Sequence, residues 1–154
     1  MKRNILFASL ACLTLFIILI SFTPANNNNN ANLVQDVLIQ TNNFRRTKGL
    51  PALIIRNELN EIARQHSANM ARGRVGFGHG GFERRNALAK GKIRTINSFA
   101  ENVAYGATSG KAVVSMWKNS SGHRRNMLGR YKYIGIGTAK DSQGRIFYTQ
   151  VFAG

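Results

Sequence analysis

Residues 133–152 read YIGIGTAKDSQGRIFYTQVF, two runs of strand-forming residues around a short polar interruption. Tyr133–Ala139 and Arg145–Phe152 are rich in β-branched and aromatic side chains, as is typical of strands. Asp141-Ser142-Gln143-Gly144 separates them and consists of residues that favour turns. This part of the chain therefore predicts a β-hairpin.

Two segments upstream have the spacing of amphipathic helices. From Asn32 the apolar residues fall three and four positions apart, and Asn32 is a suitable N-cap. Gly49 and Pro51 predict the end of this helix. A second helix is expected to start at Asn57, again with one apolar face.

The middle of the chain has a different composition. Six glycines between residues 73 and 92 predict an irregular segment, followed by a short strand or turn at Phe99–Tyr105. Ser109 and Ser121 are suitable caps for two more helices, the second of which runs through Leu128. Helices followed by a terminal hairpin predict a layered domain of helices and strands.

The first 25 residues predict an export signal. Met1-Lys2-Arg3-Asn4 is basic, Ile5–Phe22 carries no charge, and Thr23-Pro24-Ala25 offers small residues for cleavage after Ala25. An uncleaved membrane anchor through residues 5–22 is the alternative, because 18 residues are just long enough to cross a bilayer core of about 30 Å. Both interpretations predict a secreted or extracytoplasmic domain.

The sequence predicts one domain without disulfides. Residues 26–31 include five consecutive asparagines and are expected to form a linker, because they can bury nothing. Residues 32–154 are expected to form the domain. The only cysteine, Cys12, lies in the hydrophobic N-terminal segment. The domain must therefore be stabilised by its core alone.

The charge of the chain is strongly asymmetric. The sequence has 22 lysines and arginines against 6 acids, and without residues 1–25 there are 20 bases against 6 acids, a net charge of +14. The bases are spread from Arg45 to Arg145, which excludes a basic tail and predicts a broadly cationic domain that attracts polyanions. Nucleic acid is not an expected partner, because no nucleic-acid motif is present and the chain carries an export signal.

The candidates for chemistry are three histidines and one acid. His66 falls on the apolar face of the second predicted helix, and we interpret it as a half-buried packing residue. His79 lies in the glycine-rich loop Phe77–Gly81, where its imidazole is accessible. His123 lies at a predicted helix start. Glu101 stands in an apolar context, where a charge needs a partner.

His79, Glu101 and His123 suit a divalent metal such as zinc, with water in the open position. They equally suit a hydrogen-bonded polar cluster in a cleft. The three lie 22 residues apart at each step, and no local zinc motif such as His-Glu-x-x-His is present, so the spacing does not decide. A serine nucleophile at Ser120 is not expected, because the chain has no Gly-x-Ser-x-Gly elbow.

A set of short pieces occurs in order along nearly all of Leu33–Phe152. They include Asn43-Phe44-Arg45, Gly49-Leu50-Pro51-Ala52-Leu53, His66-Ser67, Gly78-His79, Glu101-Asn102-Val103-Ala104, Trp117, Ser121-Gly122-His123-Arg124-Arg125-Asn126-Met127-Leu128 and Ile134-Gly135-Ile136-Gly137. Each piece is weak alone, but together they resemble the CAP superfamily of cysteine-rich secretory, antigen 5 and pathogenesis-related 1 proteins. The similarity is greatest to its cysteine-poor bacterial branch.

The resemblance implies an α+β fold, a three-layer α-β-α sandwich of SCP or PR-1-like type with a C-terminal β-hairpin. The family cleft holds two histidines and two acids, and some members bind a divalent cation there. His79 and His123 match the two histidines. Glu101 matches the acid of a Gly-Glu-Asn motif, with Ala100 in place of the glycine. Ser120 stands at the second acid position, which implies a weaker metal site, with zinc as the expected ion.

The resemblance also bears on function. We expect Ser120, Asn102 and Arg124 to line the cleft. Some family members bind sterols or other lipids, so the expected function is an extracellular binding protein for an anionic surface polymer, a lipid or a sterol-like ligand. The alternative is a metal-dependent hydrolase with Glu101 as base, although the family has no generally accepted common activity.

Overall fold

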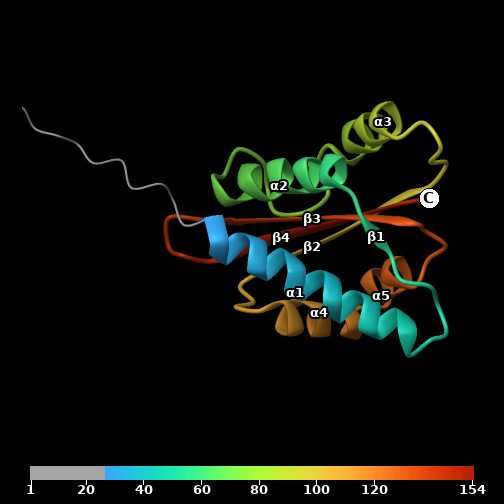
Figure 1. Ribbon diagram of the computed structural model, residues 1–154. Coiled ribbons are helices and arrows are strands. Elements are labelled where there is room, and N and C mark those ends of the chain that lie inside the picture. The colour runs from blue at the N-terminus through green and yellow to red at the C-terminus, as the bar shows by residue number, and fades with distance from the viewer. Residues whose placement is uncertain (1–26) are drawn as a thin grey trace, which may run out of the picture.

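The computed structural model describes residues 27–154 (Figure 1). The predicted signal or anchor at residues 1–25 lies outside the described residues. Within residues 27–154, none of the helices has the length and apolar character needed to cross a membrane.

The chain forms a four-stranded sheet between two layers of helices (Figure 1). The sheet order is β1-β3-β4-β2, in which β1 runs parallel to β3 and the other neighbours are antiparallel. Helices α2 and α3 cover one face of the sheet, and α1, α4 and α5 cover the other (Figure 1). The elements are α1 (Asn27–Arg46), β1 (Ile54–Ile55), α2 (Asn57–Ala71), α3 (Phe82–Lys92), β2 (Phe99–Tyr105), α4 (Gly110–Asn119), α5 (Ser121–Met127), β3 (Tyr133–Lys140) and β4 (Ile146–Ala153). The expected α+β fold, a three-layer α-β-α sandwich, is confirmed.

The predicted hairpin is strands β3 and β4, with Tyr133 opposite Ala153 and Lys140 opposite Ile146. Because helices cover both faces of the sheet, the two strands are buried on both sides, which explains why their sequences are apolar runs. Gly137 lets α2 approach closely, since a Cβ atom there would lie 2.0 Å from the backbone nitrogen of Arg64.

The start of α1 differs from the helix start expected from the sequence. The helix begins at Asn27 rather than at the predicted cap Asn32, so residues 27–31 of the expected linker are helical. Asparagine is a poor helix former, but extending a helix that is already docked adds one hydrogen bond per residue without a new nucleation cost.

The predicted caps are partly correct. Ser109 caps α4, and its hydroxyl accepts a hydrogen bond from the backbone nitrogen of Ala112 at 3.1 Å. Ser121 is instead the first residue of α5, and Ser120 takes the cap position without a side-chain bond.

The segment 73–92, predicted to be irregular, contains α3. Its N-cap is Gly81, whose φ of 78° is in the left-handed region that glycine adopts at little cost. The buried face of α3 carries Arg85 and Ala89. The prediction was wrong because this face contains a charged residue, which hides the helical periodicity that an apolar residue would have produced.

Candidate functional site

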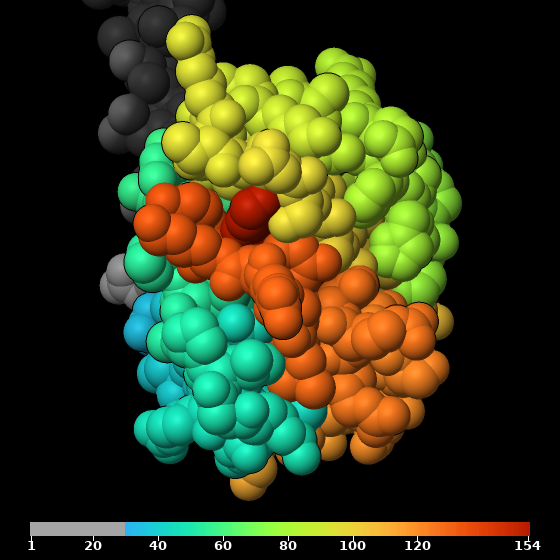
Figure 2. Space-filling model, turned by 90° about the vertical axis from the view of Figure 1, so that its right-hand side faces the viewer, coloured from blue at the N-terminus to red at the C-terminus, as the bar shows by residue number. Residues whose placement is uncertain are grey.

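Adjacent residues of the edge strand β2 face the two helical layers, because side chains alternate along a strand. Glu101 contacts the layer of α2 and α3, and Asn102 contacts α5 in the other layer. The green residues that include the glycine-rich loop and the orange residues of α5 adjoin on one side of the molecule in Figure 2. The candidate site lies where this loop, β2 and α5 meet.

The centre of the site is a buried ion pair. The side chain of Glu101 has no exposed surface. Arg85 donates from Nε to Oε2 at 2.5 Å and from Nη2 to Oε1 at 2.7 Å, so the guanidinium and the carboxylate form a bidentate ion pair. Arg85 is therefore the positive partner that the buried charge of Glu101 needs in its apolar context.

His79 contacts the same carboxylate. Its Nδ1 lies 2.9 Å from Oε1 of Glu101, which makes Nδ1 the protonated nitrogen and leaves Nε2 as an acceptor in the neutral ring. The side chain is 50% exposed, so the far edge of the ring faces solvent. Arg85 also donates from Nη1 to the carbonyl of Gly80 at 2.8 Å and from Nη2 to that of His79 at 3.3 Å. Arg85 thereby fixes both the acid and the loop that carries the histidine.

His66 belongs to this cluster, which the sequence did not reveal. The residue is buried rather than half-buried, and its Nε2 lies 2.8 Å from the carbonyl of Gly78 and 3.8 Å from Oε1 of Glu101. Burial lowers the pKa of the His66 imidazole, and the charge of Arg85 lowers it further, against a raising effect of the bond to Gly78. His66 is therefore a neutral hydrogen-bonding member of the cluster at neutral pH.

His123 lies on the other side of β2, in the first turn of α5. Its main-chain carbonyl accepts a hydrogen bond from Nδ2 of Asn102 at 3.1 Å. Asn102 also bonds to Gln150, which donates to Thr41 at 2.9 Å. Burial lowers the pKa of the His123 imidazole, and the charge of His79 lowers it further. The charge of His79 thus acts on His123, although no described contact joins the His123 ring to Glu101.

A groove of about 520 Å³ adjoins His123. Residues of the edge strand β2 line it, and Ser120 and His123 are polar residues of its lining. Three large apolar side chains at its border are exposed, namely Phe77 at 52%, Tyr105 at 45% and Met116 at 48%. The remaining lining residues are Val103, Ala104 and Trp117.

The three residues expected to line the cleft have different positions. Ser120 lines the groove. Asn102 is fully buried, and its side chain donates a hydrogen bond to the carbonyl of His123 in α5. Arg124 is exposed on α5, with Nη1 3.4 Å from the carbonyl of Lys118.

The donor set as folded does not fit a resident zinc ion. Among residues 27–154, no three His, Cys, Asp or Glu side chains are grouped so that they could hold one metal. Both oxygens of Glu101 already accept N–H groups, from Arg85 and from His79. Of the two alternatives that the sequence left open, the geometry favours the hydrogen-bonded polar cluster.

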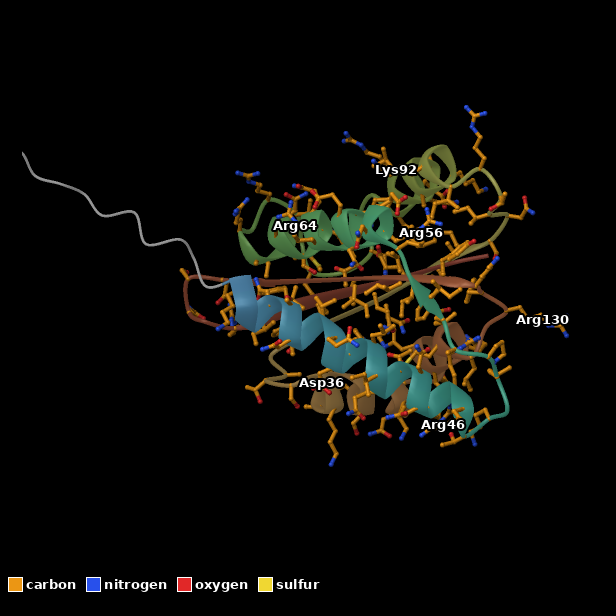
Figure 3. The ribbon with its side chains drawn as sticks, viewed as in Figure 1. Asp36, Arg46, Arg56, Arg64, Lys92 and Arg130 are labelled. Atoms are coloured by element: carbon orange, nitrogen blue, oxygen red, sulfur yellow. The ribbon has the colours of Figure 1, made fainter. Side chains whose placement is uncertain are left out.

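Basic side chains occur in both helical layers of the described residues. Figure 3 shows Arg64 and Lys92 on the layer of α2 and α3, Arg46 at the end of α1 in the other layer, and Arg130 beyond α5. Four of the six acids pair with an arginine, namely Glu58, Glu61, Glu101 and Asp141. Basic side chains are thus present in both helical layers.

Comparison with known proteins identifies related sequences. The family model described as the cysteine-rich secretory protein family, CAP, matches residues 38–152. The chain is 32% identical over 124 residues to the uncharacterized membrane protein YlbC of Bacillus subtilis, covering 77% of this chain and 33% of that protein. It is 31% identical over 122 residues to the uncharacterized protein YkwD of the same organism, covering 74% and 44%. The chain thus spans less than half the length of these two relatives.

Solved structures share the fold. An extracellular protein containing an SCP domain from Bacillus anthracis superposes with a TM-score of 0.69 at 29% identity, covering 80% of this chain and 41% of that one. A cysteine-rich secretory protein from Staphylococcus aureus gives 0.66 at 25% identity, with coverages of 82% and 40%. An outer surface protein of Borrelia burgdorferi gives 0.64 at 19% identity, with coverages of 77% and 90%, a likeness of fold alone.

Proposed function

The chain belongs to the cysteine-rich secretory protein family, CAP, and from this premise we propose that it is an extracytoplasmic binding protein for anionic amphiphiles. The ligand's apolar chain lies in the groove beside β2, and its anionic head lies beside Ser120 and His123. The observation that carries the proposal is the gathering of exposed Phe77, Tyr105 and Met116 around one groove.

The apolar border of the groove supports an apolar ligand. Exposed large apolar side chains scattered singly need no explanation, but a cluster of them around a concavity marks a binding site. Tyr105 stacks on Phe147 and meets Phe77 edge-on, with ring centroids 5.5 Å and 4.9 Å apart. These aromatic contacts hold the border in place before a ligand arrives, which reduces the entropy cost of binding.

The edge of β2 argues against a peptide strand as the occupant. Strand addition needs unpaired backbone groups along a sheet edge. Here the carbonyl of Glu101 accepts from Nδ2 of Asn126 at 3.0 Å, and that of Val103 accepts from Nε1 of Trp117 at 3.2 Å. With these carbonyls engaged, a hydrocarbon chain, which needs no hydrogen bonds, suits the groove better.

Charge favours an anionic head. None of the residues that line the groove is acidic, and Arg124 lies next to His123 on the exposed face of α5. The excess of 14 positive charges outside residues 1–25 attracts anions from all directions and raises their local concentration. Anionic lipids and anionic surface polymers of a cell envelope are the ligand sources that we propose, consistent with the export signal predicted at residues 1–25.

A metal-dependent hydrolase, the alternative from the sequence, has less support. Its base would be Glu101, whose carboxylate has no exposed surface and accepts hydrogen bonds from Arg85 and His79. A base must lie within hydrogen-bond reach of the proton that it removes. The buried carboxylate does not meet that condition for a substrate in the cleft.

Trp117, the only tryptophan of the chain, lines the groove, so its fluorescence is expected to change when the groove is occupied. The test is a fluorescence titration of the full-length chain, reconstituted in neutral phosphatidylcholine vesicles, with octyl phosphate, octyl glucoside or inorganic phosphate. Octyl phosphate is expected to bind most tightly, and its affinity is expected to fall as salt is added.

Met116→Glu is the test variant, and Ile39→Glu is the matched control, because Ile39 is an equally exposed apolar helical residue on α1 at 46% exposure. We expect Met116→Glu to weaken octyl phosphate binding by about tenfold or more, since it adds a like charge beside the head and removes an apolar contact. Ile39→Glu should leave it unchanged. Equal affinities of the two variants, or equal binding of octyl glucoside, would refute the proposal.

A further inference from the structure

The buried guanidinium of Arg85 occupies the place where a cation would neutralise Glu101. A buried carboxylate needs a positive partner, and either a metal ion or an arginine can provide it. Arg85 contacts both carboxylate oxygens, at 2.5 and 2.7 Å. The side chain of Arg85 is 10% exposed and that of Glu101 is not exposed at all, so both members of the ion pair are shielded from water.

The positive charge at this position is fixed. A guanidinium is not deprotonated in proteins, so Arg85 keeps its charge whether or not a metal ion approaches. Arg85 is also held by the carbonyls of Gly80 and His79, so it cannot swing away without releasing the loop. Gly81 leaves room for this arrangement, because a Cβ atom there would lie 3.2 Å from Nη1 of Arg85.

We propose that Arg85 excludes divalent metals from the cleft, so that His79 and Glu101 become metal ligands only when this charge is removed. A zinc ion at Glu101 would have to displace the two hydrogen bonds from Arg85 and to lie against a fixed positive charge at low dielectric, where like charges repel strongly. In this chain Arg85 is thus a specificity-determining residue that keeps the polar cluster free of metal. The inference does not depend on the proposed amphiphile, because its readout is bound zinc and not lipid.

The experiment measures zinc bound at equilibrium by the full-length chain in a nonionic detergent, dialysed against buffered free zinc. Each chain is compared with its own His79→Ala version, so that zinc held elsewhere cancels. The wild type and Arg85→Lys, which keeps the charge, are expected to bind no more zinc than their His79→Ala versions. Arg85→Met and Arg85→Gln are expected to bind one additional zinc per chain, with an affinity at least about tenfold above that of the wild type.

Two results would overturn the inference. One is a wild-type chain that binds one zinc more than its His79→Ala version at the same free zinc concentration. The other is a pair of uncharged variants that retain a cooperative thermal transition and yet gain no zinc. The wild-type comparison can still refute the inference where Arg85→Met and Arg85→Gln fail to fold.

Discussion

The side chain of Asn102 donates a hydrogen bond to the main-chain carbonyl of His123 at 3.1 Å, across 21 residues of sequence. The preceding residue, Glu101, accepts a hydrogen bond from the ring of His79 at 2.9 Å. Two neighbouring residues of β2 therefore hold the two sides of the cleft, one through a ring and the other through the backbone of α5.

Replacing Asn102 by leucine is expected to destabilise the fold by about 2–4 kcal/mol, because Gln150, Asn126 and the carbonyl of His123 each lose a buried hydrogen-bond partner. The measurement is urea unfolding followed by circular dichroism. Asn119→Ala is the control, since Asn119 is exposed on α4 and its replacement should change stability by less than about 0.5 kcal/mol. Equal effects of the two substitutions would contradict the structural role given to Asn102.

Arg45→Met is expected to cost about 3 kcal/mol or more. Arg45 is 1% exposed and donates from Nε to the carbonyl of Pro51 and from Nη1 to those of Met127 and Gly129, at 2.8 to 2.9 Å. Methionine preserves the packing of the stem but leaves three carbonyls without this donor. Arg46→Met, at the exposed neighbouring position, is the control and should be almost neutral in the same unfolding assay.

Gly137→Ala is expected to cost more than about 3 kcal/mol or to prevent folding, because the added Cβ atom would lie 2.0 Å from the backbone nitrogen of Arg64 in α2. Gly91→Ala is its counterpart, since nothing lies within 4 Å of a Cβ atom there and alanine is the better helix former. Thermal unfolding should show a lower midpoint for the first variant and an equal or higher midpoint for the second. A tolerated Gly137→Ala would disprove the close approach of α2 to β3.

Stability is expected to fall as the pH is lowered below about 6.5. Burial lowers the pKa of His66 and of His123 in the folded state. The unfolded chain therefore binds more protons than the folded chain, so stability is fully present above the unfolded pKa and is lost as pH falls through the folded pKa values. His66→Gln, which can keep a donor to the carbonyl of Gly78, should flatten this dependence.

Thermal midpoints measured between about pH 8 and about pH 5 test this expectation. A midpoint that stays constant or rises on acidification in both chains would show that His66 and His123 are not buried in the neutral form.

Much of the fold could be predicted, because its signals are local. The hairpin is encoded by two strand-forming runs and the turn residues between them, and both strands are observed where they were expected. Helix α3 could not be found in this way. Its buried face carries Arg85 rather than an apolar residue, so the helical periodicity is absent from its apolar pattern.

The site was predictable only in part, for physical reasons. His79 and Glu101 were expected in one cleft, and they are in contact. Arg85 could not be singled out, because it is one of 20 bases outside residues 1–25 and only its contact with Glu101 in the folded chain distinguishes it. The one available signal was that Glu101, in an apolar context, needs a positive partner. His66 was interpreted as a packing residue, because a histidine that only packs and one that joins a buried hydrogen-bonded cluster both lie on the apolar face of a helix.

The groove was missed because it has no sequence signature. Phe77 comes from the glycine-rich loop, Tyr105 from the end of β2, and Met116 from α4. No periodicity links such positions, and their common border exists only after the three segments have packed together.

The central claim is that this groove binds an anionic amphiphile, and photoaffinity labelling tests it most directly. The full-length chain in neutral vesicles is irradiated with an alkyl phosphate that carries a diazirine on its chain, and the labelled residues are identified by mass spectrometry. We predict labels at Phe77, Tyr105 and Met116 that disappear when unlabelled octyl phosphate is added in excess. Labelling confined to other parts of the chain, or labelling of these residues that excess octyl phosphate does not prevent, would contradict the account.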